Sequence, residues 1–149
     1  MAAENVGKVI DILLVEDNLG DARLAEEALK DSKIKNKLYV VTDGEEASDF
    51  LFRKGNHSKA PRPDLILLDL NLPKKDGREL LAEIKNDQTL KRIPVVILTI
   101  SKAEEDIKKT YNLHANCYIT KPLDLEQFMR VIKSIEEFWL TIVVLPSGK

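Results

Sequence analysis

Residues 64–77 read Asp64-Leu65-Ile66-Leu67-Leu68-Asp69-Leu70-Asn71-Leu72-Pro73-Lys74-Lys75-Asp76-Gly77, an apolar run that ends at a carboxylate and leads into a turn. An apolar run without alternation is typical of a strand that is buried on both faces. The stretch therefore predicts a central strand of a parallel sheet, with Asp69 where the strand surfaces. Asp76-Gly77 predicts the start of the next helix.

Similar apolar runs recur along the chain, near residues 9–15, 38–41, 65–70, 95–98 and 117–120. Most of them predict strands buried on both faces, and the segments between them carry apolar residues at helical spacing. Alternating strands and helices predict right-handed crossovers and a parallel sheet covered on both sides. We therefore predict an α/β fold, a single flavodoxin-like, doubly wound (βα)5 domain with strand order 2-1-3-4-5. Residues 53–64, rich in Gly, Pro, Asn and Ser, predict an irregular loop.

Length and composition are ordinary for one soluble globular domain, with 149 residues, 44% hydrophobic and 32% charged. The formal charge of −2, with interspersed acids and bases, gives no reason to expect a nucleic-acid or anionic-membrane partner. The N-terminus has no apolar signal core, and no apolar stretch approaches the roughly 20 residues that span a bilayer. Cys117 is the only cysteine, which excludes an intrachain disulfide. We predict a cytoplasmic protein.

Polar side chains that could form a site gather where the predicted strands end: Glu16, Asp17, Asp69, Thr99 and Lys121. Ligands of open α/β sheets bind at the carboxyl ends of the strands. Converging carboxylates repel one another unless a cation enters, and a set of oxygen ligands favours Mg²⁺. Zinc is disfavoured because His57 and His114 lie far apart in the sequence and away from the strand ends.

Asp69 is the candidate nucleophile, because it ends a buried strand and the turn after it keeps it accessible. Attack of a carboxylate on a phosphoryl group gives an aspartyl phosphate, a reaction that depends on positioning and charge neutralisation. Mg²⁺ and Lys121 would neutralise the charge. The Thr99 hydroxyl could donate a hydrogen bond to a phosphoryl oxygen. These residues predict a combined cation and phosphate site.

Five motifs, in this order and spacing, together resemble the response-regulator receiver domain over about residues 8–137. They are Leu13-Leu14-Val15-Glu16-Asp17-Asn18, the segment from Leu67 to Gly77, Pro94-Val95-Val96-Ile97-Leu98-Thr99, Cys117-Tyr118-Ile119-Thr120, and Lys121-Pro122. The resemblance implies a phosphorylation switch in a two-component phosphorelay.

The resemblance also implies a role for each residue that matches the motifs. Asp69 would accept the phosphoryl group, Asp17 would bind Mg²⁺ directly and Glu16 mostly through water. Asn71 would contribute its backbone carbonyl to the metal.

Three further residues of the motifs would hold and sense the phosphoryl group. Lys121 would hold it, Thr99 would move toward it, and Tyr118 would change rotamer together with Thr99. The neighbouring Ile100, at a position that is usually small in the family, could narrow the path to the phosphoacceptor.

A closer resemblance covers residues 61–79, 113–120 and 135–140, which look like the small stand-alone regulators of cyanobacterial phytochromes. It implies that a light-sensing histidine kinase is the phosphoryl donor. About a dozen residues follow the last predicted helix, too few for an output domain. We therefore predict one receiver domain over residues 1–149, with a C-terminal extension at about 138–149 and output through protein contacts.

Other interpretations of these residues have different consequences. A Mg²⁺-dependent phosphohydrolase would want a general acid at position 71, where Asn71 cannot protonate a leaving group. A dinucleotide or flavin binder would need a Gly-rich first turn, whereas Glu16 and Asp17 would repel phosphate. Taken singly, Asp17 could cap the following helix. The C-terminal extension could fold back onto the domain, or the apolar residues of the last predicted helices and of this extension could form a homodimer contact.

Overall fold

The computed structural model describes residues 9–32, 35–99, 117–120, 126, 128–130 and 133–134. Five parallel strands form one sheet in the order β2-β1-β3-β4-β5. Their bounds are β1 (Ile10–Val15), β2 (Asn36–Val41), β3 (Leu65–Asp69), β4 (Val95–Thr99) and β5 (Cys117–Thr120). The predicted flavodoxin-like, doubly wound fold and its strand order are confirmed.

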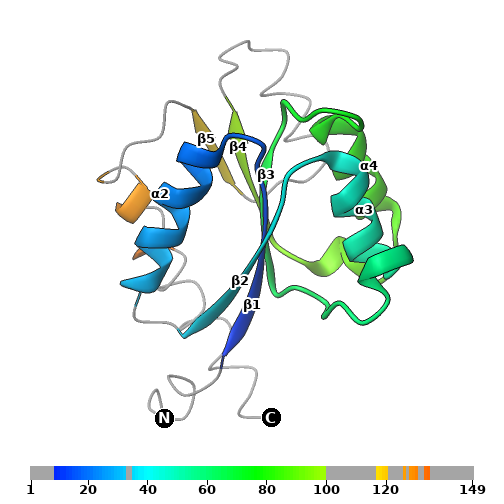
Figure 1. The fold of residues 1–149 in the computed structure, drawn as a ribbon, viewed down its shortest axis with the longest axis horizontal. Helices are drawn as coiled ribbons and strands as arrows, with labels where there is room; N and C mark the ends of the chain where they lie inside the picture. The colour runs from blue at the N-terminus through cyan, green and yellow to red at the C-terminus, as the bar shows by residue number, and fades with distance from the viewer. Residues whose placement is uncertain are drawn as a thin grey trace.

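Helices cover both faces of the sheet: α2 (Leu19–Lys30) lies on one face, and α3 (Gly44–Phe52) and α4 (Gly77–Asn86) lie on the other (Figure 1). Two short 3-10 turns, η1 (Gly55–His57) and η2 (Leu90–Arg92), follow α3 and α4. Successive strand residues point to opposite faces, so Leu13 packs in the core beneath α3 and α4 while Leu14 packs beneath α2. This double burial explains the unbroken apolar runs in the sequence.

Helices α2, α3 and α4 each begin at a side chain that accepts a hydrogen bond from the first turn. Asn18, Asp43 and Asp76 are the N-caps of α2, α3 and α4. The predicted helix start at Asp76 is confirmed. The interpretation of Asp17 as the cap of the following helix is wrong, because the neighbouring Asn18 caps it.

Two details of the sequence-based prediction need correction. Residues 53–64 are not wholly irregular, because the His57 amide donates to the Lys54 carbonyl at 3.0 Å and closes η1. Strand β2 is not buried on both faces, because it is an outer strand of the sheet. Its Val40 side chain is 42% exposed and Lys37 is exposed as well.

Several predicted segments lie outside the described residues, including the helix expected near Ile107 and Tyr111 and the C-terminal extension. Of the last predicted helix, residues 128–130 are helical, and Phe128 is fully buried in the core on the α2 side. Among the residues that the structure describes, no helix has the length and apolar character needed to cross a membrane.

Candidate functional site

The register of the central strands brings Glu16 and Asp69 side by side. Val15 pairs with Leu68, so the two acids are the next residues on neighbouring strands. Carboxylate oxygens of Glu16, Asp17 and Asp69 all lie within 4.8 Å of one another. The sequence analysis predicted this meeting of three acids, and the structure confirms it.

Burying the carboxylates of this cluster costs free energy unless a positive charge neutralises them. Glu16 is 1% and Asp69 is 3% exposed, whereas Asp17 faces solvent. The prediction that the turn keeps Asp69 accessible is therefore wrong, because the start of α4 packs against the end of its strand. Buried charges are stable only when they are paired, hydrogen-bonded or bound to a metal. Three carboxylates fit a hard divalent cation such as Mg²⁺, Mn²⁺ or Ca²⁺, with Asp17 on the side open to water.

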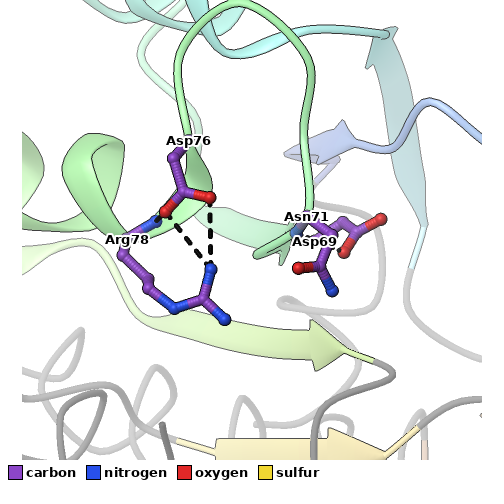
Figure 2. A network of polar contacts seen from close by, with 4 residues as sticks. All are labelled: Asp69, Asn71, Asp76 and Arg78. Carbon is purple, nitrogen blue, oxygen red and sulfur yellow. Dashed lines mark hydrogen bonds and ion pairs between the residues drawn. The ribbon is translucent and has the colours of Figure 1, made fainter.

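Backbone amides two residues further along the chain hold both buried carboxylates. The Asn71 amide donates to Asp69 Oδ1 at 2.9 Å, and the Asn18 amide donates to Glu16 Oε2 at 3.1 Å. Figure 2 shows Asp69 and Asn71 together at the end of the strand. Such local bonds fix the orientation of a carboxylate. The sequence analysis did not predict these two hydrogen bonds. The signal for them is a polar turn residue two positions after each acid, Asn18 after Glu16 and Asn71 after Asp69.

The start of α4 presses against the backbone of the candidate phosphoacceptor. A Cβ atom at Gly77 would lie 2.4 Å from the Asp69 carbonyl oxygen and 2.6 Å from the Leu70 Cα, so only glycine fits. The Gly77 amide donates to the Leu70 carbonyl at 2.9 Å. Sequence reasoning identified Asp76-Gly77 only as a helix start and missed this contact, because it depends on how the loop folds back.

Arg78 secures the N-cap of the same helix. Its guanidinium Nη1 lies 3.1 Å from Asp76 Oδ1, at the far end of the loop from Asp69 (Figure 2). Asp76 also accepts a hydrogen bond from the Arg78 amide at 2.9 Å. The loop between Asp69 and α4 is therefore anchored at both ends.

The backbone also places Thr99 near the site. Leu98 pairs with Asp69, so Thr99 is one residue further along the next strand, and Thr99 pairs with Thr120. Tyr118 lies on β5 opposite Ile97. The side chains of Thr99 and Tyr118, and the whole of Lys121 and Ile100, lie outside the described part of the chain, so their roles stay predictions.

A parallel α/β sheet with an acidic cluster at the carboxyl ends of its strands is the arrangement expected of a receiver domain, a class of signalling proteins. The chain belongs to this family, because the family model for the response regulator receiver domain matches residues 12–133.

Relatives with known names narrow this assignment. The chain is 54% identical over 137 residues to the response regulator Rcp1 of Synechocystis sp., covering 92% of this chain and 93% of that protein. The solved structure of the phosphorylated cyanobacterial phytochrome response regulator RcpA is similar, with a TM-score of 0.82 and 57% identity, and the match covers 89% of this chain and 95% of RcpA. The Mn²⁺-bound form of Rcp1 is also similar, with a TM-score of 0.81 and 53% identity, and the match covers 89% of this chain and 96% of that one. The chain is a receiver-domain response regulator related to those of cyanobacterial phytochromes.

Proposed function

We propose that the chain accepts a phosphoryl group on Asp69 from a histidine kinase, with Mg²⁺ held by Glu16, Asp17, Asp69 and the backbone carbonyl of Asn71. The observation that carries this proposal is the meeting of three carboxylates within 4.8 Å at the carboxyl ends of β1 and β3. The Mn²⁺-bound form of the related Rcp1 supports a divalent cation in such a protein.

In the proposed reaction, a carboxylate oxygen of Asp69 attacks the phosphorus of a phosphohistidine. A P–O bond forms and the P–N bond breaks, and its electron pair returns to the imidazole nitrogen, which becomes neutral or takes a proton from solvent. Glu16, Asp17 and Asp69 would hold Mg²⁺, which would supply positive charge to neutralise the phosphoryl oxygens. The chain contributes positioning, because the Asn71 amide holds Asp69 Oδ1 and the Gly77 contact sets the end of the strand.

After phosphorylation, three residues would hold and report the phosphoryl group. Lys121 would bind it, and Thr99 and Tyr118 would shift together and change the surface near β4 and β5. The output would be a protein contact. A phytochrome-like histidine kinase is the proposed donor, since the similar RcpA is a cyanobacterial phytochrome response regulator.

Phosphoryl incorporation tests the proposal directly. The full chain is incubated with Mg²⁺ and acetyl phosphate, or with phosphorylated phytochrome-like kinases, and the product is quantified by intact-protein mass spectrometry. We expect one phosphoryl group per chain, lost in Asp69→Asn and retained in the exposed control Asp49→Asn. Incorporation into Asp69→Asn would overturn the assignment. Multiple turnover of a phosphomonoester would favour a phosphohydrolase instead.

We further propose that the C-terminal extension, residues 138–149, takes part in a homodimer contact. Its run of apolar residues supports this arrangement, because exposed apolar patches are often interfaces. Analytical ultracentrifugation of the full chain and of a chain ending at Glu137 is the test. We expect a dimer that the truncation dissociates, and a monomer in both cases contradicts the proposal.

A further inference from the structure

A groove runs beside β2, the outermost strand of the sheet at the edge opposite β5. It has a volume of about 430 Å³, and we name it the edge groove. Its apolar lining comes from β2, from α3 and from the segment after η1: Tyr39, Val40, Val41, Phe50, Ala60 and Pro61. None of these residues belongs to the carboxylate cluster, so the edge groove is separate from the candidate phosphorylation site.

Aromatic rings give the edge groove a preformed lining. The rings of Tyr39 and Phe50 are tilted, with centroids 5.5 Å apart, and those of Phe50 and His57 are 5.4 Å apart. Phe50 is also a member of the core beneath α3 and α4, and His57 Nε2 lies 3.4 Å from a Glu46 carboxylate oxygen. The lining is thus anchored to the core, and a ligand could bind without rearranging it.

Two lysines supply the charge of the lining itself, whereas two carboxylates lie just behind it: Glu46 beside His57, and Asp11, which accepts a hydrogen bond from the Tyr39 hydroxyl at 3.4 Å. Lys37 and Lys59 are exposed and line the edge groove, and the described lining contains no carboxylate. The Lys37 ammonium lies 5.4 Å from the centroid of the Tyr39 ring, which keeps the cation over the apolar lining. A ligand that combines an apolar side chain with carboxylates is complementary to this arrangement.

The backbone of β2 favours an extended ligand. Among the described strands, β2 pairs only with β1, so its other side presents the edge of the sheet. An extended peptide can add to such an edge by main-chain hydrogen bonds, while pockets for its side chains give specificity. Lysines on edge strands also protect proteins from self-association. If the edge groove bound no ligand, this protection would be the role expected of Lys37.

We propose that the edge groove binds an extended acidic segment of a partner protein. An apolar side chain of that segment enters the edge groove between Tyr39 and Pro61, and its carboxylates pair with Lys37 and Lys59. This contact goes beyond the proposed phosphoryl transfer and does not require it. It gives the protein a docking surface on the sheet edge far from β5.

Selection of peptides on the full chain tests the proposal. A display library of random 12-residue peptides is panned against the protein, and the double variant Lys37→Glu/Lys59→Glu serves for counter-selection. We expect enriched peptides with an apolar residue flanked by acids. By isothermal titration, they should bind the double variant about tenfold or more weakly, because two attractive charge pairs become repulsive. Binding should also weaken as salt is raised.

Matched controls separate this contact from nonspecific attraction. The variant Lys91→Glu/Arg92→Glu has the same charge change at exposed residues of η2 and should bind the selected peptides like the unchanged protein. Replacement of the apolar peptide residue by glycine should abolish binding. NMR amide shifts should cluster in β2 and residues 56–61. Failure to enrich acidic peptides, equal binding to the double variant, or shifts elsewhere would overturn the proposal. Phosphoryl incorporation into Asp69 is measured separately and does not depend on this result.

Discussion

Asp17 differs from the other two acids of the carboxylate cluster because its side chain is exposed while Glu16 and Asp69 are buried. The buried pair is oriented by the amides of Asn18 and Asn71. Asp17 therefore lies where a cation from solvent first meets the cluster. It adds negative charge that helps metal binding and opposes folding when no metal is bound.

The substitution Asp17→Asn separates these two effects. We expect Mn²⁺ to bind about tenfold or more weakly, because oxygen-ligand sites depend on ligand charge. In the metal-free protein we expect a gain of up to about 1 kcal/mol in the free energy of unfolding, the Coulomb energy of two unit charges about 4 Å apart in water. Calorimetric titration with Mn²⁺ measures the affinity. Urea unfolding in the presence of a chelator measures the free energy of unfolding of the metal-free protein.

Asp31→Asn removes an exposed acid at the end of α2 and is the control. It should leave Mn²⁺ affinity unchanged. Unaltered Mn²⁺ binding in Asp17→Asn would show that this residue is not a metal ligand.

At the scale of elements, α3 is fastened to the loop that follows the candidate phosphoacceptor. The Gly44 amide donates to the Pro73 carbonyl at 3.3 Å, and a Cβ atom at Gly44 would lie 1.9 Å from the Lys75 carbonyl oxygen. Lys74 pairs with Asp43 at 3.7 Å. Because Asn71 lies in the same loop, the start of α3 helps to set the position of the proposed metal ligand.

The substitution Gly44→Ala should therefore affect both stability and metal binding. We expect a loss of about 1–3 kcal/mol in the free energy of unfolding, because the added methyl group forces the loop away. Displacement of the loop should also weaken Mn²⁺ binding. Urea unfolding and calorimetric Mn²⁺ titration are the measurements.

Glu45, the next residue, is exposed, and the substitution Glu45→Ala provides the matched control. It should change stability by less than about 0.5 kcal/mol. If Gly44→Ala destabilises the protein but binds Mn²⁺ normally, the loop does not position the metal ligand.

At the scale of the whole molecule, the described residues form two apolar cores, one on each face of the sheet. The core beneath α3 and α4 includes Leu81, and the core beneath α2 includes Phe128 from the last predicted helix. Each core contains residues from the central strands. Loss of packing on one face should therefore loosen the strands whose ends form the site.

A pair of leucine substitutions tests this dependence on packing. Leu81→Ala should lower the free energy of unfolding by about 2–5 kcal/mol, because the side chain is fully buried and truncation leaves a cavity. Leu19→Ala should change it by less than about 0.5 kcal/mol, since Leu19 is 75% exposed. Urea unfolding of both variants gives the comparison, and similar values would contradict the assignment of Leu81 to the core.

Much of the fold follows from local patterns in the sequence. The apolar runs ending at Val15 and Asp69, and the helix start at Asp76, are signals within a few residues, so the strands and the meeting of three acids at their ends could be predicted. Hydrophobic periodicity carries this information because the central strands β1 and β3 must bury both faces. The strand order followed from the alternation of strands and helices along the chain.

Only the tertiary structure decided which surfaces lie next to each other. The fit of Gly77 against Asp69, the contact of Gly44 with Lys75 and the edge groove beside β2 join residues brought together by chain folding. Apolar composition could not distinguish the outer strand β2 from the buried strands, because both are rich in β-branched and aliphatic residues. The predicted strand order already placed β2 at an edge of the sheet, but the exposure of its outward residue Val40 is a property of the assembled molecule.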